Sequence, residues 1–333
     1  MRKVSRASPR ASERRNSVLE RRGLLIGLGV AVVLVVVLWL TGQERSIVIG
    51  VVTGSAYGLV ALGLVLIYKS SGVFNFAQGE FGSVAVCTLY LLHTSGVPYG
   101  LAVVGALLAG ALFGFLTERI VIRPLFEAPR VILLVATAGV ALLAIAVQQW
   151  LFDNQGRPIS RAFPTLDRVT ILDVQISDQR LWLIGSLAVL AVLLGLFFTK
   201  TNLGLAIIGA SQEPTATELV GISVRRLSTF VWVLAALLGA LAAIIAVPDT
   251  GSFTPGVMTS GYLIPAFTAA VLGGMTSLPG AFLGGVLVGI VQAVATNAEV
   301  FQDIPGTPST LIVFVVLLAV LVIRPKGLLG KSA

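Results

Sequence analysis

Long apolar runs separated by short polar stretches dominate the chain. Ten apolar segments occupy residues 24–40, 47–68, 79–92, 98–117, 131–151, 181–198, 228–247, 261–278, 280–297 and 308–323. A straight membrane-spanning helix needs about 20 such residues, so the short segments at 79–92 and 280–297 are the least certain crossings. The break at 277–280 predicts either a turn or a kink. The pattern predicts an all-α, polytopic transmembrane helical bundle of about 8–10 spans.

Composition places the whole chain in the membrane class. It is 56% hydrophobic and 11% charged, whereas a soluble domain carries about 25% charged residues. The single cysteine, Cys87, excludes an internal disulfide, and the single histidine, His93, excludes a histidine-rich metal site. The net charge of +8 lies in the loops and the N-terminal tail. This distribution favours contact with the lipid bilayer over binding of nucleic acid.

The distribution of basic residues also predicts the orientation. If the N-terminus is cytosolic and all ten segments cross, 18 of the 23 Lys and Arg residues lie inside and 5 outside, as the positive-inside rule requires. Both termini are then cytosolic. The run at 24–40 is interpreted as a retained first span, because it is long and no small-residue cleavage site follows it. The predicted organisation is a basic cytosolic tail at 1–22, one transmembrane domain at 23–325 with an outer loop at 152–180 and a cytosolic loop at 199–227, and a cytosolic C-terminus at 326–333.

The outer loop at 152–180 is a polar stretch whose acidic and basic charges cancel. Val169 and Ile171, then Val174 and Ile176, alternate with polar residues, which predicts a small β-hairpin. Two interpretations stay open: a docking face for an external partner, or a plain connecting loop.

A second polar stretch, at 201–227, contains a short predicted helix over 215–220. Pro214 suits its first turn, and Gly221 suits the left-handed position just past its end. So short a helix needs a partner surface, and Leu219, Val220 and Ile222 offer apolar contact. Either it rests on its own bundle, or it couples the bundle to another protein.

Polar residues interrupt the apolar pattern at 74–82, FNFAQGEFG. Asn75 and Gln78 have the spacing of a capping box, and Glu80 would fall in the first turn of the helix, where the helix dipole favours an anion. Helix capping therefore explains all three residues. The alternative is a broken helix whose polar end lines the translocation path or a gate.

Glycines recur at the four-residue spacing that lets helices approach closely within lipid. The spaced glycines include Gly50, Gly54 and Gly58, and also Gly280 and Gly284. We interpret them as helix-packing residues; participation in a pore is the alternative.

The chain carries no recognisable catalytic or nucleotide-binding motif. The C-terminal Gly330–Lys331–Ser332 imitates the end of a phosphate-binding loop, but Pro325 replaces its first glycine and no helix can follow. The sequence therefore predicts no catalytic residue, no metal site and no cofactor in this chain. Any ATP-driven work must come from a partner.

Five stretches together resemble the LivH-type permease subunits of ABC importers for branched-chain amino acids. These stretches are FNFAQGE at 74–80, ERIVIRPL at 118–125, the loop at 204–227, AFTAAVLGGMTSLPGAFLGGVLVGIVQA at 266–293 and RPKGLLG at 324–330. The resemblance implies a transport subunit, not an enzyme, in the bacterial inner membrane. It also implies a similar second permease as a heterodimer partner, two cytosolic ATPase subunits that bind ATP and Mg, and an extracytoplasmic solute-binding protein.

The resemblance assigns the loop at 204–227 to the coupling helix that contacts the ATPase. The residues concerned are Glu213, Pro214, Glu218, Leu219 and Gly221. The chain also departs from the family. Gln78 stands where the family often has histidine, the start of the loop is less basic, and the basic tail with its first span is longer.

The sequence leaves alternatives open for the transported solute and for the class of membrane protein. Related systems move urea, short amides or other small organic solutes instead of branched-chain amino acids. A self-contained ion-coupled secondary transporter would need an intramembrane ion site, for which Glu80 is the best candidate. A purely structural membrane subunit is the third alternative.

Overall fold

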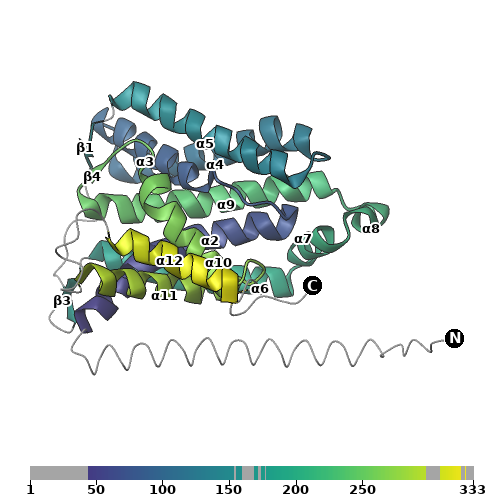
Figure 1. Ribbon diagram of the computed structural model, residues 1–333. Helices are drawn as coiled ribbons and strands as arrows, with labels where there is room; N and C mark the ends of the chain where they lie inside the picture. Colours follow the sequence, from purple (N-terminus) through teal and green to yellow (C-terminus); the bar gives the residue numbers. More distant parts are fainter. Residues whose placement is uncertain are drawn as a thin grey trace.

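The computed structural model describes residues 44–153, 155–159, 169–171, 174–176, 178–297, 308–323 and 327. The predicted tail and the predicted first span at 24–40 lie outside the described residues. In the described part the chain folds into long helices packed side by side (Figure 1). The long helices are α2 (Glu44–Ser71), α3 (Gln78–Thr94), α4 (Tyr99–Leu116), α5 (Arg130–Phe152), α6 (Asp178–Lys200), α9 (Val224–Ala246), α10 (Ile264–Gly273), α11 (Leu278–Asn297) and α12 (Pro308–Ile323).

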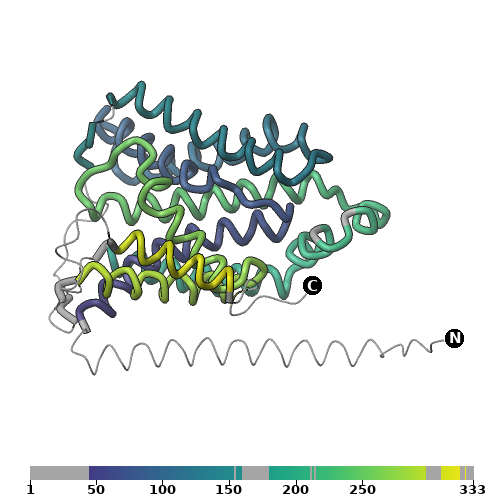
Figure 2. Tube along the Cα trace, in the orientation of Figure 1, coloured from purple at the N-terminus to yellow at the C-terminus, as the bar shows by residue number. Residues whose placement is uncertain are grey.

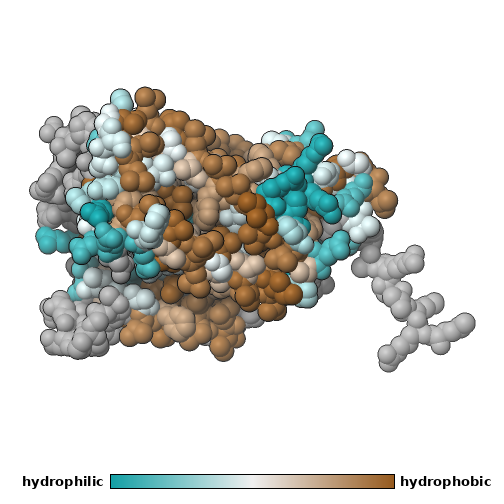
Figure 3. Space-filling view, turned by 90° about the horizontal axis from the view of Figure 1, so that it is seen from above, coloured by the Kyte–Doolittle hydropathy of each residue, from teal (hydrophilic) through white to brown (hydrophobic). Residues whose placement is uncertain are grey.

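Each predicted apolar segment from 47–68 onward corresponds to one of these helices, which confirms the all-α, polytopic prediction. In the described residues six helices are long and apolar enough to cross a membrane alone, and α11 is one of them. Figure 3 shows apolar residues across the middle of the molecule and polar residues toward its two ends. The chain is therefore a multi-pass membrane protein. The chain turns at residues 274–277, between α10, which ends at Gly273, and α11, which begins at Leu278, so the break is a turn that lies a few residues before the predicted 277–280.

Short elements join the long helices. They are the π-helices η1 (Thr117–Ile122) and η4 (Thr259–Leu263), the 3-10 helices η2 (Arg123–Leu125) and η3 (Val247–Thr250), the short helices α7 (Asn202–Gln212) and α8 (Pro214–Leu219), and the strands β1 (Arg157–Pro158), β2 (Val169–Ile171), β3 (Val174–Ile176) and β4 (Ser252–Phe253). Helices α7 and α8 lie at one end of the bundle, which we call the α8 end (Figure 1). The strands lie at the opposite end, which we call the β end.

The strands confirm one prediction and add an unexpected contact. β2 and β3 pair antiparallel with Val169 opposite Ile176, as the alternating pattern predicts. β1 pairs with β4, so Arg157 lies opposite Phe253. This second pair ties the loop after α5 to the segment that follows η3.

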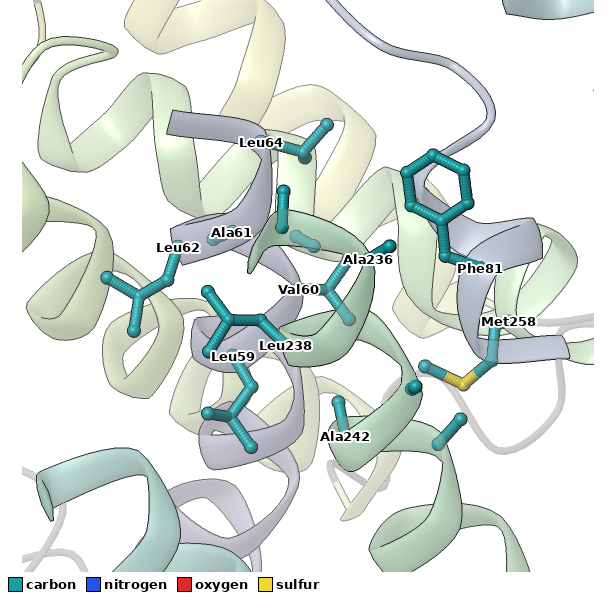
Figure 4. Close-up of a cluster of buried hydrophobic side chains, with 14 of the residues drawn as sticks. Leu59, Val60, Ala61, Leu62, Leu64, Phe81, Ala236, Leu238, Ala242 and Met258 are labelled. Atoms are coloured by element: carbon teal, nitrogen blue, oxygen red, sulfur yellow. The ribbon is translucent and has the colours of Figure 1, made fainter. Parts of the chain in front are cut away.

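The core is centred on α2 and α9, whose most apolar windows are each 72% buried. Leu59 of α2 lies near Leu238 of α9, and Phe81 of α3 and Met258 lie at the opposite side of the cluster from Leu62 (Figure 4). The windows of α4, α5 and α6 are only 22–28% buried within the chain. Their apolar outer faces suit contact with lipid or with another membrane subunit.

Glycines lie where helices approach most closely. A side chain at Gly50 or Gly54 of α2 would collide with the backbone of α11 around Gly285 and Ile290. On the other face of α11, Gly280 and Gly284 meet the backbone of α10. Gly58 faces the side chain of Leu187 on α6, while its own backbone lies against Gly285. Backbones this close gain van der Waals contact that larger residues would prevent.

Candidate functional site

The first candidate site is the short helix α8 at the α8 end. Pro214 occupies its first turn, and Gly221 has a φ of +84°, as the sequence predicts. The Gly221 N–H bonds to the Glu218 carbonyl at 2.9 Å, and the Ile222 N–H bonds to the Thr217 carbonyl at 3.2 Å. These bonds satisfy carbonyls that the helix end would otherwise leave free, so the chain stops and turns here.

Helix α7, directly before α8, is an element that sequence reasoning missed. Thr201 caps it by accepting a hydrogen bond from the Gly204 N–H at 3.0 Å. A side chain at Gly204 would collide with the backbone of α6 at Phe197 and Phe198, so glycine permits the tight α6–α7 corner. The available signal was Thr201 itself, because threonine is one of the residue types preferred at a helix N-cap.

The apolar residues of α8 do not rest on the bundle. Leu219 is 84% exposed and Val220 is 73% exposed, whereas Ile222 packs against the core. Of the two alternatives for this short helix, the exposure of Leu219 and Val220 does not favour the one in which they rest on their own bundle. Glu213 and Glu218 are exposed beside them. The arrangement presents two apolar side chains and two carboxylates at the tip of the α8 end.

The chain passes from the tip of the α8 end directly into the buried helix α9. Ser223 Oγ accepts a hydrogen bond from the Arg226 N–H and so caps α9, the buried central helix. Near this point the buried Glu118 accepts hydrogen bonds from Arg123 at 3.4 Å and Thr229 at 2.9 Å. Both Glu118 and Arg123 belong to the ERIVIRPL stretch, which thus joins the end of α4 to the start of α9.

The second candidate site is the polar stretch before α3. After α2 the chain turns at Gly72, whose φ is +65°, and runs back along the helices before α3 begins (Figure 2). Asn75 and Gln78 are almost fully buried there. Non-helical backbone at membrane depth is tolerated only where protein surrounds it.

The predicted capping box does not form. The N-cap of α3 is Ala77, and no side chain caps the helix. Asn75 Oδ1 instead accepts a hydrogen bond from the Ala77 N–H at 3.0 Å, and Gln78 Nε2 donates to the Ala235 carbonyl of α9 at 2.9 Å. Burial explains the difference, because in the interior a side-chain amide must satisfy itself on whichever helix packs against it.

Glu80 is fully buried and is held by polar side chains. Gln148 Nε2 of α5 donates to Glu80 Oε2 at 2.6 Å, and Ser83 Oγ lies 3.4 Å from Glu80 Oε1. Gln148 Oε1 accepts from the Gly256 N–H at 3.0 Å, and Ser83 Oγ accepts from the Met258 N–H at 3.2 Å. This network joins α3, α5 and the segment before η4.

Sequence reasoning selected Asn75, Gln78 and Glu80 but missed Gln148 and Ser83. The signal for Gln148 was a glutamine inside the apolar run at 131–151, since polar residues in hydrocarbon need a partner. Cys87 of α3 is buried, with 6% of its surface exposed. Among the described residues, no group of three or more His, Cys, Asp and Glu side chains could hold a metal ion.

Comparison with known proteins identifies the family. Residues 46–323 match the family described as branched-chain amino acid transport system / permease component. The chain is 31% identical over 304 residues to the high-affinity branched-chain amino acid transport system permease protein BraD of Pseudomonas aeruginosa, covering 86% of this chain and 95% of the relative.

Two further relatives extend the comparison. The chain is 28% identical over 312 residues to the permease protein LivH of the high-affinity branched-chain amino acid transport system of Escherichia coli K12, covering 85% of this chain and 94% of the relative. It is 28% identical over 269 residues to the autoinducer 2 import system permease protein LsrD of an Escherichia coli strain, covering 78% of each. The chain belongs to the family of permease components of branched-chain amino acid transport systems.

Proposed function

We propose that this chain is the membrane permease subunit of an ATP-driven ABC importer for branched-chain amino acids in the bacterial inner membrane. The observation that carries the proposal is the family match over 46–323 together with the exposed apolar tip of α8. An isolated helix of six residues is unstable in water, so exposed leucine and valine at its tip suit a partner surface.

The partner at this tip is one of two cytosolic ATPase subunits, which bind ATP and Mg. Leu219 and Val220 provide apolar contact, while Glu213 and Glu218 lie beside them for basic groups of the partner. A similar second permease completes the membrane part as a heterodimer, and an extracytoplasmic solute-binding protein delivers the substrate at the β end. Family membership supports these partners in general terms.

Coupling then follows from the connection between α8 and the core. When ATP closes the ATPase pair, α8 is displaced, and the displacement passes through Ser223 into α9. Because α9 packs in the centre of the bundle, its displacement shifts the surrounding helices as rigid bodies. The translocation path then opens toward the outer face of the membrane. Asn75, Gln78 and Glu80 lie on the α3 side of α9 and are candidates for the path or its gate.

The test of coupling is a matched pair of variants in the complex purified with its co-purifying subunits. Leu219→Ser removes an exposed apolar side chain at the α8 tip. Leu101→Ser makes the same change near the β end, where Leu101 is 63% exposed. We expect Leu219→Ser to lower ATP-dependent leucine uptake by about tenfold, the size typical of an interface anchor. Leu101→Ser should keep normal uptake.

The same experiment tests the other functions. Recovery of a P-loop ATPase and a second permease in the pull-down, with vanadate-sensitive uptake, supports the importer. Uptake by this chain alone, driven by a proton gradient, would refute the importer and favour an ion-coupled transporter centred on Glu80. The LsrD relative is named for a solute other than a branched-chain amino acid, so the substrate must be tested separately. Urea, short amides and other small organic solutes are therefore added as competitors in the leucine uptake assay.

A further inference from the structure

The connection between α4 and α5, at the α8 end, is an irregular stretch of backbone. Helix α4 passes into the π-helix η1 and then at once into the 3-10 helix η2, and α5 begins at Arg130. We call residues 117–129 the elbow. The apolar windows of α4 and α5 are each 28% buried, against 72% for α9, so packing within the chain holds the two helices less firmly than it holds α9. Single π-helical turns are rare and are frequent at functional sites.

A buried ion pair closes the elbow. Glu118, in η1, is fully buried, and Arg123, the first residue of η2, has a side chain that is 22% exposed. Arg123 Nε lies 3.4 Å from Glu118 Oε1, and Arg123 Nη2 lies 3.4 Å from Glu118 Oε2. A buried charge is costly unless it keeps its ion pair and its hydrogen bonds. Burial of Glu118 therefore favours arrangements in which all of its partners stay in place.

Helix α9 supplies the third member of this group. Thr229 Oγ1 accepts a hydrogen bond from Arg123 Nη2 at 2.7 Å and donates one to Glu118 Oε2 at 2.9 Å. Arg123 also donates to the Arg225 carbonyl, in the first turn of α9, at 3.3 Å. A hydroxyl both donates and accepts, so threonine serves the guanidinium and the carboxylate at once, whereas valine of similar shape serves neither. We call Glu118, Arg123 and Thr229 the clamp.

We infer that the clamp makes the elbow follow the start of α9 when α8 is displaced. Only a few residues separate α8 from α9, and the clamp holds α9 within its first two turns. A displacement that enters α9 at Ser223 therefore also reaches α4 and α5 through the elbow, and the three clamp residues are positioning residues for transport. The inference rests on the proposed function, because it extends coupling from α9 to the two less buried helices.

The hydroxyl of Thr229 tests the clamp in the complex purified with its co-purifying subunits. Loss of a hydrogen bond to a charged group changes an equilibrium by about tenfold, so Thr229→Val should lower the leucine taken up per ATP hydrolysed by about that factor. Thr229→Ser keeps the hydroxyl and should keep the normal ratio. Arg123→Lys keeps the charge but loses the planar group that reaches several acceptors, so it should uncouple as Thr229→Val does.

The matched control is Thr199→Val at the end of α6, because the Thr199 hydroxyl bonds to the Gly195 carbonyl of its own helix. This variant should keep the normal ratio of uptake to hydrolysis. A clamp that only stabilises the fold would lower the melting temperature of Thr229→Val without changing the ratio. An unchanged ratio in Thr229→Val and Arg123→Lys therefore overturns the inference.

Spin labels follow the elbow directly. With Cys87 replaced by alanine, Glu127→Cys labels the elbow and Thr215→Cys labels α8, both at exposed positions. Pulsed electron paramagnetic resonance of the complex compares the nucleotide-free state with the state trapped by ATP and vanadate. We expect the distance between the two labels to be the same in both states, and to differ between them when Thr229→Val is added. A distance that changes in the unmodified clamp, or that stays constant in Thr229→Val, overturns the inference.

A second label pair separates failure of the clamp from failure of the proposed function. Thr215→Cys with Ser95→Cys measures α8 against the β end, and we expect this distance to change between the two nucleotide states. A constant distance here, or the absence of ATP-dependent uptake by the unmodified complex, refutes the proposed coupling itself. A changing distance with ATP-dependent uptake, beside a normal ratio in Thr229→Val, refutes only the clamp.

Discussion

Single residues in the interior carry the strongest structural requirements. Glu80 is a carboxylate at membrane depth, and its described donors come from Gln148 and Ser83. An ionisable group in such a place is costly and usually functional. Its hydrogen-bond partners Gln148 and Ser83 also bond to the backbone of the non-helical segment before η4.

Gln148 can be tested against its neighbour. Gln148→Leu removes the 2.6 Å donor to Glu80 and the 3.0 Å acceptor of the Gly256 N–H. Each buried group left without a partner costs about 1–3 kcal/mol, so the melting temperature should fall clearly. Gln149 is exposed, so Gln149→Leu should change the melting temperature by no more than about one or two degrees. Thermal unfolding in detergent, followed by tryptophan fluorescence, measures both, and equal melting temperatures would contradict the importance of the network.

Gly54 offers a second residue-scale test. An added methyl group in Gly54→Ala would lie 2.8 Å from the Val286 Cα of α11, with backbone on the other side. Overpacking of this kind costs about 1–3 kcal/mol. At Gly139 of α5 nothing lies within 4 Å, so Gly139→Ala should instead stabilise its helix by about 0.5–1 kcal/mol. Opposite shifts in melting temperature are expected, and a neutral Gly54→Ala would count against close α2–α11 packing.

At the scale of elements, the sequence predicted what local chemistry decides. Apolar runs located the long helices, and Pro214 and Gly221 located α8 to within one residue. These two residues are good local signals because the proline ring and the positive φ of the glycine fix the backbone of the adjacent residues. The start of α3 was misjudged because its capping residues are buried. The partners Ala235 and Gln148 lie 157 and 68 residues away from Gln78 and Glu80, and no local pattern reports such contacts.

The stop of α8 is itself testable. Gly221→Val places a β-branched residue at a φ of +84°, where L-residues with a Cβ are strained by about 1–2 kcal/mol. We expect the end of α8 to rearrange, so that ATP hydrolysis continues while leucine uptake in the same complex falls severalfold. Gly209→Ala in α7 is the control, because its methyl group meets only an ordinary contact 3.7 Å away. Normal uptake by Gly221→Val would remove the main support for coupling through α8.

The molecule as a whole has two different ends, and their sides of the membrane remain a prediction from the basic residues. With Cys87 replaced by alanine, Ser95→Cys and Thr215→Cys each introduce one exposed thiol, at the β end and the α8 end. In intact cells an impermeant maleimide should label Ser95→Cys and not Thr215→Cys. After permeabilisation both should react. Labelling of Thr215→Cys from outside would reverse the orientation and place α8 beyond reach of an ATPase.

The hydrogen bonds around Glu80 also bear on the electrical insulation of the membrane. The amides of Ala77, Gly256 and Met258 lie in or beside non-helical backbone, and each bonds to a protein side chain. Bare amides at this depth would draw in water. Because side chains take the place of that water, we expect this region to exclude water. Without a continuous chain of water molecules, protons cannot be conducted across this region. The interruptions in the helices therefore need not make the membrane permeable to protons.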